Sequence, residues 1–347
     1  MHLGLTWIVL VGGCVVGVSA DEAQEAMTAL NRAYWDGTRH CFRKTPAADS
    51  KPLDFWMTAH VWEGVMDAYE RHGDATYKEQ IGQVYEGFLK RHPDWRTNPY
   101  NDDVMWWTIA CVRAYGVTGE QRYLDKARSE FDRLYSQEVD ATLGGGMWWK
   151  SDEHKTKNAC VNGPAAITAL ALASALKDET YASKGRELYA WERAHLFDTQ
   201  TGAVYDNVNT QGRVTRWRFT YNQGTFIGAA LRLYRWADEK QYLDDAILAG
   251  SYMRRRLCNE AGILKSEGQG DGGTFKLIGV RYMVELAQAT QDTELFDWLR
   301  KNAETAWRNR RAADGIMGFD WSRPVREDEV IECQSAAAGV VLLNLLK

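Results

Sequence analysis

Two adjacent aspartates, Asp102 and Asp103, are the residues of this chain best suited to catalysis. They lie between Tyr100-Asn101 and Trp106-Trp107. Ionised neighbouring carboxylates repel each other, so the pair is costly unless it retains one proton or a substrate separates the charges. Two carboxyl groups about 5 Å apart beside aromatic rings are what a retaining glycosidase needs. The alternative is that Asn101 or Asp102 only caps a helix that begins near Val104.

The sequence contains no other catalytic signature. The seven histidines are scattered, without an HExxH motif or paired ligand spacing, and the six cysteines include no CxxC pair. A GxSxG motif for a serine nucleophile is missing. The run Gly144-Gly145-Gly146 lacks the GK[ST] of a phosphate-binding loop. Carboxylates are therefore the predicted catalytic groups, and we predict neither a metal nor a cofactor.

The composition favours a carbohydrate ligand. A formal net charge of −5 offers no basic footprint for nucleic acid or anionic lipid, and no basic pocket for a uronate sugar is evident. The chain has 15 tryptophans and 16 tyrosines but only six prolines. Aromatic rings suit the flat apolar faces of sugars, although packing in a core would use the same residues. We therefore expect a sugar substrate and no nucleic-acid partner.

Residues 1–20 have the features of a secretory signal peptide. The segment from Leu3 to Val18 is uncharged and apolar, and Val18-Ser19-Ala20 is a small-x-small cleavage pattern. Lipid attachment at Cys14 and an uncleaved anchor are alternatives, but apolar residues continue past Cys14 and the run is short for a span. We predict a secreted, periplasmic or cell-surface protein. Residues 21–347 then form a single catalytic domain, a monomer without a membrane-spanning segment.

Helical periodicity dominates residues 21–347. Apolar residues repeat at intervals of three and four in 55–69, 106–115 and 226–234. Short acidic turns recur, each followed by an aromatic residue: Tyr77, Tyr123, Tyr181, Tyr242 and Phe296. Their spacings are 46, 58, 61 and 54 residues, about one helical hairpin each. The sequence therefore predicts an all-α fold in which six hairpins close into a toroid.

The loops at the opposite ends of these hairpins hold the remaining conspicuous residues, and a toroid would gather them at one mouth. Candidates for stacking on sugar rings are Trp106, Trp107, Trp148, Trp149 and Tyr221. The other candidate substrate-binding residues are Asp206, Asn158, Asn162, Asn222, Gln223, Phe275 and Lys276. The three asparagines could instead cap helices. The triple glycine is expected to turn sharply and approach a ligand, delivering Trp148 and Trp149 to the site.

Seven motifs resemble, in one collinear order, those of glycoside hydrolase family 76. Each motif alone is weak, but seven in order are a specific signal. They are Asp102-Asp103…Trp106-Trp107, Tyr123-Leu124-Asp125-Lys126-Ala127, Gly144-Gly145-Gly146-Met147-Trp148-Trp149, Lys157-Asn158…Asn162-Gly163, Gly202…Tyr205-Asp206, Tyr221-Asn222-Gln223-Gly224 and Phe275-Lys276…Arg281-Tyr282.

The resemblance implies an (α/α)6 barrel and endo-acting hydrolysis of α-1,6-mannan backbones with retention of configuration. It also implies that Asp102 is the nucleophile, that Asp103 is the general acid/base and that Asp206 binds substrate. Successive helical residues diverge by about 100°, so the pair should lie in a loop or a first helical turn to face one cleft. A helix starting near Asp103 would set Trp107 beside that acid.

Three other functions remain open from the sequence. A transglycosylase would resolve the same covalent intermediate with a sugar hydroxyl, as is thought of the fungal cell-wall relatives of this family. A non-catalytic carbohydrate-binding protein could share the scaffold, although the intact pair Asp102-Asp103 argues against it. Another (α/α)6 enzyme, such as an unsaturated uronyl hydrolase or a sugar epimerase, would use a different arrangement of carboxylates or histidines.

Overall fold

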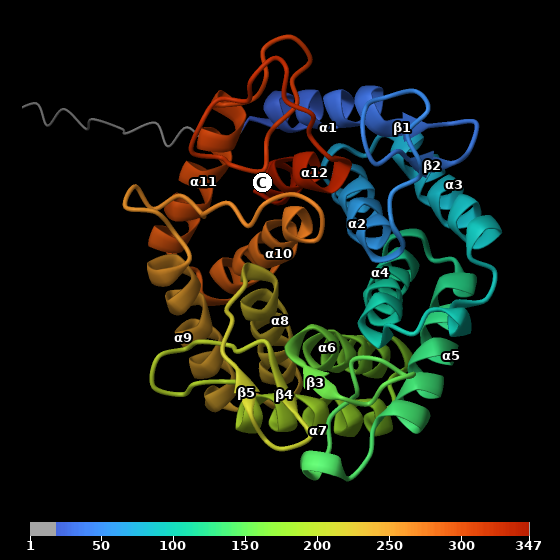
Figure 1. Ribbon diagram of the computed structural model, residues 1–347, viewed down its shortest axis with the longest axis vertical. Helices are drawn as coiled ribbons and strands as arrows, with labels where there is room; N and C mark the ends of the chain where they lie inside the picture. Colours follow the sequence, from blue (N-terminus) through green and yellow to red (C-terminus); the bar gives the residue numbers. More distant parts are fainter. Residues whose placement is uncertain (1–18, 347) are drawn as a thin grey trace, which may run out of the picture.

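A computed structural model of the chain describes residues 19–346, and within them twelve α-helices form two concentric rings (Figure 1). The inner ring holds α2 (Phe55–His72), α4 (Asn101–Thr118), α6 (Ala159–Leu176), α8 (Thr220–Ala237), α10 (Gly272–Thr290) and α12 (Cys333–Leu345). The outer ring holds α1 (Ala20–Tyr34), α3 (Ala75–Arg91), α5 (Gln121–Glu138), α7 (Glu179–His195), α9 (Lys240–Arg256) and α11 (Thr293–Arg308). Each inner helix packs against the next, and α12 packs against α2, so the inner ring is closed. This confirms the predicted all-α (α/α)6 barrel.

Six inner–outer helix pairs build the two rings. Five inner helices, α2 to α10, each pack against the outer helix that follows in the chain. The sixth pair is made by α12 and α1, which lie side by side in Figure 1. The last helix of the described residues therefore completes its pair with the first one. The predicted number of six hairpins is reached in this way.

The short turns between inner and outer helices follow the predicted repeat. Five inner helices end at a C-cap residue in the left-handed conformation: Gly73, Gly119, Lys177, Asp238 and Gln291. A left-handed residue reverses the chain while its N–H satisfies a carbonyl of the last helical turn. The tyrosines that follow four of these turns are buried: Tyr77, Tyr123, Tyr181 and Tyr242.

The inner helices are apolar on most sides because neighbours surround them. α6 packs against α4, α7 and α8, and its sequence is apolar all round. Within residues 19–346 it is the one helix long and apolar enough to cross a membrane by length and composition, but most of it is buried. The core helix of a closed ring has this same composition.

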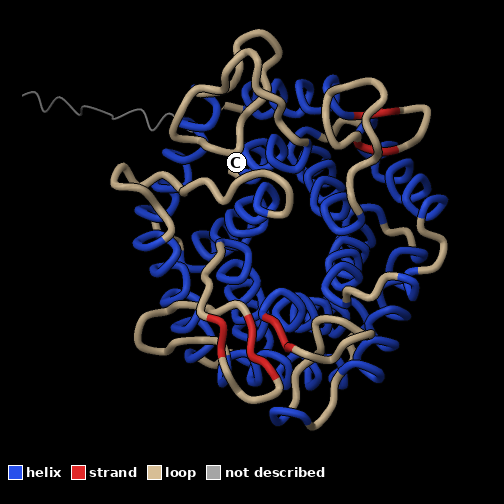
Figure 2. The backbone as a smooth tube through the Cα atoms, in the orientation of Figure 1, coloured by secondary structure: helices blue, strands red, loops and turns tan. Residues whose placement is uncertain are grey.

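In the part of the chain that the structure describes, two small sheets lie in the loops, and neither was predicted (Figure 2). β1 (Trp35–Asp36) pairs with β2 (Cys41–Phe42). β3 (Thr156–Asn158), β4 (Asn207–Asn209) and β5 (Val214–Thr215) form an antiparallel sheet in that order. The register sets Asn158 opposite Asn207, directly after Asp206. Two short 3-10 helices, Trp95–Thr97 and Thr142–Gly144, complete the loops.

The predicted signal peptide lies outside the described residues except for Ser19 and Ala20. Ser19 caps α1: its hydroxyl accepts the Glu22 backbone N–H, and the Glu22 carboxylate accepts the Ser19 N–H. The five described cysteines are all buried free thiols: Cys41, Cys111, Cys160, Cys258 and Cys333. Burial is the expected state of a free cysteine, which packs as a small hydrophobic residue.

Candidate active site

The N-terminal ends of five inner helices surround a pocket of about 570 Å³. Trp56 comes from the start of α2, Asp102 from α4, Cys160 from α6, Tyr221 from α8 and Phe275 from α10. Strands β3 and β4 add the rest of one side. Helix N-termini carry the positive end of the helix dipole, so this end of the ring favours carboxylates and developing negative charge.

Asp102 and Asp103 lie in the first turn of α4, and both line the pocket. The helix begins at Asn101 after the N-cap Tyr100, whose side chain makes no capping bond. The Asn101 amide instead donates to Glu138 Oε2 at 3.1 Å and to the Trp148 carbonyl at 2.9 Å. The alternative in which Asn101 or Asp102 caps a later helix is therefore wrong.

The Asp102 carboxylate is partly buried at the pocket wall. Its Oδ2 accepts a hydrogen bond from the Cys160 thiol at 3.2 Å, and its buried Oδ1 accepts none of ordinary geometry. Burial raises the pKa of Asp102 to about 6, and the Cys160 thiol and the Trp149 indole N–H oppose that shift. Asp102 therefore ionises in the weakly acidic range.

Asp103 retains its proton to higher pH than its neighbour. Burial, and after it the nearby charges of Asp102, Asp271 and Asp54, raise the pKa of Asp103 to about 8. A hydrogen bond from the Asn98 amide to Oδ2 at 2.8 Å acts in the opposite direction. Near neutral pH the pair therefore holds one proton, with Asp103 the favoured site.

Asp206 is the third acidic residue described in the pocket lining, and it is buried. Its Oδ2 accepts from the Asn207 amide at 2.7 Å and its Oδ1 accepts from the Asn222 amide at 3.2 Å. Burial raises the pKa of Asp206, and these amide contacts limit the rise. Asn222 is fully buried behind Asp206, so its predicted contact with substrate is corrected to a contact with this carboxylate. It is not a cap either, because the N-cap of α8 is Phe219.

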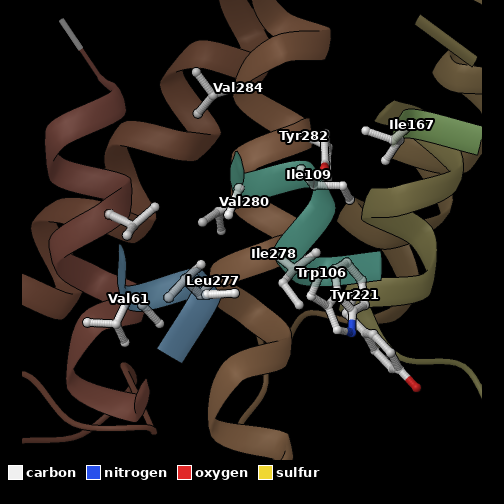
Figure 3. Close-up of a cluster of buried hydrophobic side chains, with 14 of the residues drawn as sticks. Val61, Trp106, Ile109, Ile167, Tyr221, Leu277, Ile278, Val280, Tyr282 and Val284 are labelled. Carbon is white, nitrogen blue, oxygen red and sulfur yellow. The ribbon is translucent and has the colours of Figure 1, made fainter. Parts of the chain in front are cut away.

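Aromatic rings form apolar parts of the wall. Tyr221 stacks on Phe275 with ring centroids 4.0 Å apart and 13° between the planes. Trp106 lies 6.5 Å from Tyr221, and Figure 3 shows the two at the edge of a buried apolar cluster, with the Tyr221 hydroxyl pointing away from it. Trp149 packs edge-on against Tyr100 at 5.4 Å. Carboxylates framed by flat rings suit a sugar, which has apolar faces and a polar edge.

The structure gathers a majority of the predicted site residues around the pocket. Those that line it are Asp102, Asp103, Asp206, Trp106, Trp149, Asn158, Tyr221 and Phe275. Asn158 is the N-cap residue of α6, but its side chain makes no capping hydrogen bond. The remaining predicted residues are Trp107, Trp148, Asn162, Asn222, Gln223 and Lys276, and they do not belong to the lining.

Two of the predicted tryptophans point into the protein. Trp107 stacks on Phe88 at 3.6 Å and donates to the Phe55 carbonyl at 2.9 Å. Because α4 begins at Asn101, Trp106 faces the pocket and Trp107 does not, contrary to the predicted pairing of Trp107 with Asp103. Trp148 is buried with its indole N–H bonded to Asp140 Oδ2 at 3.0 Å.

Asn162, Gln223 and Lys276 are also corrected, because each is buried and bonded to loop backbone. The Asn162 amide bonds both the N–H and the carbonyl of Met147, at 2.7 and 3.1 Å. The Gln223 amide accepts a backbone N–H and donates to two carbonyls of neighbouring segments. Lys276 Nζ donates to the Phe319 carbonyl. These side chains hold loops to the inner helices and do not touch the pocket.

The triple glycine makes the predicted sharp turn but does not approach the pocket. Gly144, Gly145 and Gly146 have φ of 75°, 128° and 76°. A Cβ on Gly146 would lie 2.3 Å from the ring of Trp191, so the close approach is to α7. Of the two tryptophans that follow, Trp149 alone reaches the pocket.

Eight lining residues were not among the predicted ones. They are Trp56, Tyr100, Thr156, Cys160, Asn207, Trp217, Phe219 and Asp271. Trp217 and Phe219 alternate with Arg216 and Arg218 directly before the Tyr221 motif, a spacing that could have indicated an extended segment at the mouth. Thr156 and Asn207 depend on the β3–β4 pairing, for which the sequence has no signal.

The fold and the site together define a carbohydrate-active enzyme of the (α/α)6 barrel class with an adjacent carboxylate pair. Residues 19–347 match the family described as Glycosyl hydrolase family 76. The chain therefore belongs to glycosyl hydrolase family 76, as its motifs indicated.

Solved structures of this family share the whole architecture. The chain is similar to the GH76A α-1,6-mannanase from Salegentibacter sp. HEL1_6, with 34% identity and a TM-score of 0.87 over 94% of this chain and 98% of that one. It is equally similar to an inactive variant of that enzyme in complex with α-1,6-mannotetrose, in which two consecutive aspartates are replaced by alanine. There the identity is 33% and the TM-score 0.88, over 94% of this chain and 97% of that one.

Curated relatives extend the similarity to yeasts. A mannan endo-1,6-alpha-mannosidase of Saccharomyces cerevisiae is 24% identical over 331 residues, which cover 83% of this chain and 70% of the relative. A putative mannan endo-1,6-alpha-mannosidase of Schizosaccharomyces pombe is 23% identical over 207 residues, covering 54% of this chain. The match spans about half of the latter relative, 46% of its length.

Proposed function

We propose that this protein is an exported, retaining, endo-acting α-1,6-mannanase. The observation that carries the proposal is the pair Asp102-Asp103 in one pocket, with the pKa of Asp103 raised further than that of Asp102. The inactive Salegentibacter variant supports it, because that protein was inactivated at two consecutive aspartates. The chain has one other such pair, Asp244-Asp245 on α9. There Asp245 is bonded to Arg193 and Tyr189, away from the pocket.

The proposed reaction has two displacements at the anomeric carbon. In the first, the ionised Asp102 carboxylate forms a bond to the anomeric carbon. At the same time the bond between this carbon and the leaving O6 breaks, and O6 takes the proton of Asp103. In the second, Asp103 removes a proton from water, the water oxygen attacks the same carbon, and the bond to Asp102 breaks. Two inversions give net retention, and Asp103 ends protonated as it began.

The remaining lining residues bind and orient the sugar in this proposal. The Asp206 carboxylate, fixed by Asn207 and Asn222, accepts hydrogen bonds from sugar hydroxyls. Trp106, Trp149, and the stacked pair Tyr221 and Phe275 offer apolar faces to the ring. Each stacking contact contributes on the order of 0.5–1.5 kcal/mol beyond the area it buries, by analogy with aromatic pairs.

The test uses Asp102→Asn and Asp103→Asn with linear α-1,6-mannan as substrate. Each variant is expected to lose roughly three orders of magnitude in rate, because one lacks the nucleophile and the other the proton donor. On an aryl mannoside whose leaving group needs no proton, Asp103→Asn should regain the rate of the first displacement, measured as kcat/KM, and Asp102→Asn should not.

A matched control and two product measurements complete the test. Asp244→Asn changes an exposed residue of the other aspartate pair and should leave the rate unchanged. Proton NMR of the first product should show the α anomer, as retention requires, and product sizing over time separates hydrolysis from glycosyl transfer. Near-normal activity of either active-site variant, with the fold intact by circular dichroism, rejects that residue's role.

A further inference from the structure

Two further hollows adjoin the active-site pocket, and the proposed reaction does not use them. Trp217 and Phe219 line both the pocket and an adjoining depression of about 750 Å³. Arg218, Tyr252 and Arg256 line both that depression and a further cavity of about 430 Å³. The shared residues place the three spaces next to one another, from the aspartate pair outward.

We call the outer part the arginine groove and define it by Arg218, Tyr252, Arg255 and Arg256. Arg218 lies in the segment that follows β5, and the other three lie in the last two turns of α9. Figure 1 shows the β5 segment beside α9. Basic residues are common in a last helical turn, where they complement the helix dipole, so the helix end alone does not indicate a ligand. The indication of a ligand comes instead from the lack of acidic partners for these arginines within residues 19–346.

The three guanidinium groups of this groove are exposed and unneutralised. Arg218, Arg255 and Arg256 form no ion pair with any carboxylate of residues 19–346, whereas their neighbour Arg254 pairs with Glu294 at 3.5 Å. This local positive charge occurs in a chain whose net charge is −5. Like charges gathered without counter-ions repel each other, so an anion bound among them would be stabilised.

One acidic residue lines the groove, but its carboxylate is already occupied. Asp198 Oδ1 accepts the backbone N–H groups of Gln200 and Thr201 at 3.0 and 3.1 Å, and Oδ2 accepts the Tyr205 hydroxyl at 3.0 Å. Asp198 therefore accepts hydrogen bonds from its own loop and forms no ion pair with the arginines. Three arginines against one engaged aspartate leave the groove with a net positive charge.

We propose that the arginine groove is a subsite for an anionic group, phosphoryl or carboxylate, carried by the polysaccharide beyond the sugar at the aspartate pair. The inference rests on the proposed function, since it places a sugar chain in the groove. Guanidinium groups bind both anions through paired N–H donors. Trp217, 65% exposed between the pocket and the arginines, offers a ring on which an intervening sugar can stack. No such basic site was expected from the sequence, because Arg218 and the arginines of α9 come from separate segments that the fold brings together.

The test compares three α-1,6-linked manno-oligosaccharides of equal length: one neutral, one with a phosphate group and one with a glucuronate branch. For the wild-type protein, kcat/KM on at least one anionic substrate should exceed that on the neutral one by about tenfold at low ionic strength. The excess should shrink as salt is added, because exposed charges are screened. The anionic substrate with the higher kcat/KM shows whether the groove binds a phosphoryl group or a carboxylate.

The variant Arg218→Gln/Arg256→Gln should lose this preference and cleave the neutral substrate at the wild-type rate. Arg254→Gln is the matched control, because it changes an arginine of the same helix turn whose charge is already paired, and it should keep the preference. Equal kcat/KM on all three substrates, with the neutral one cleaved, overturns the groove and leaves the proposed function standing.

If no substrate is cleaved, the proposed function fails and the groove is judged by binding alone. Calorimetry with the phosphate-bearing and glucuronate-bearing oligosaccharides then reports its affinity. An affinity that Arg218→Gln/Arg256→Gln weakens by about tenfold, and Arg254→Gln does not, supports the anion subsite. An affinity equal to that of the neutral oligosaccharide overturns it.

Discussion

At the scale of single residues, burial does most to set the chemistry of the aspartate pair. The first turn of α4 favours carboxylate charge through the helix dipole, yet the pKa values of both aspartates are raised. Desolvation therefore outweighs the dipole. The charges of Asp102, Asp271 and Asp54 then separate the two acids, because all three raise the pKa of Asp103. Because the pKa of Asp103 is the higher of the two, the pair's one proton belongs to Asp103.

The rate should depend on pH in a bell shape, rising through about pH 6 as Asp102 ionises and falling through about pH 8 as Asp103 loses its proton. Asp271→Asn removes a negative charge that disfavours ionised Asp103. The pKa of Asp103 should therefore fall, and the alkaline limb of kcat/KM should move to lower pH by less than about one unit.

The acid limb should stay in place in Asp271→Asn, and Asp49→Asn, at an exposed position, serves as the control that moves neither limb. Profiles of kcat/KM from pH 4 to 10 measure both limbs. An alkaline limb that stays or moves upward in Asp271→Asn would show that this charge does not act on Asp103.

At the scale of elements, the helices were predictable and the strands were not. Helical periodicity and the acidic turns are local patterns, so the sequence indicated six hairpins and the positions of five reversals. Strands of two or three residues carry no periodicity, and pairing such as Asn158 with Asn207 depends on segments almost 50 residues apart. The part of the pocket that β3 and β4 build was therefore missed.

Adjacent tryptophans show the same limit. Neighbouring residues on a helix point about 100° apart, and in an extended segment they point to opposite sides. One member of each pair, Trp106 and Trp149, lines the pocket, while Trp107 and Trp148 enter the core. Choosing between them required the start of α4 at Asn101 and the path of the loop after the glycines, which only tertiary structure fixes.

A buried lysine, Lys157, helps to hold the loop that carries Trp149. Lys157 Nζ donates to Asp140 Oδ1 at 2.8 Å and to the carbonyls of Thr142 and Gly145 at 2.9 and 2.7 Å. Lys157→Met would leave these acceptors unsatisfied, at a cost of about 2–4 kcal/mol in the free energy of unfolding. The freed loop should also raise KM, because Trp149 would no longer be held at the pocket.

Urea unfolding and steady-state kinetics measure these two effects. Lys155→Met is the matched control, since Lys155 is exposed and its one ion pair within residues 19–346 is with Glu153. It should change neither quantity appreciably. A Lys157→Met protein with wild-type stability would show that the loop is held by its other contacts.

At the scale of the whole molecule, the two ends of the inner ring have different roles. The N-terminal ends form the pocket, where carboxylates are left poorly solvated. Deeper in the ring, Arg281 of α10 bonds both oxygens of Asp67 of α2 at 2.9 and 2.7 Å, and Arg113 of α4 contacts the same carboxylate. This buried network ties three inner helices together. In this network the buried charges are paired, whereas Asp102, Asp103 and Asp206 of the pocket form no ion pair with a cation of residues 19–346.

The last prediction follows from the raised pKa values of the aspartate pair. An aspartate with a raised pKa binds its proton more tightly in the folded state than in the unfolded one, so the free energy of unfolding falls as pH rises from about 4 through about 8. Asp102→Asn/Asp103→Asn removes both titrations. The double variant should therefore be more stable than the wild type at pH 8, by several kcal/mol, and almost equal to it at pH 4. Calorimetric Tm values at the two pH values measure the difference, and Asp49→Asn should show none. A double variant that is no more stable at pH 8 than at pH 4, relative to the wild type, would mean that the folded protein solvates the pair well, and the proton assigned to Asp103 would then have no physical cause.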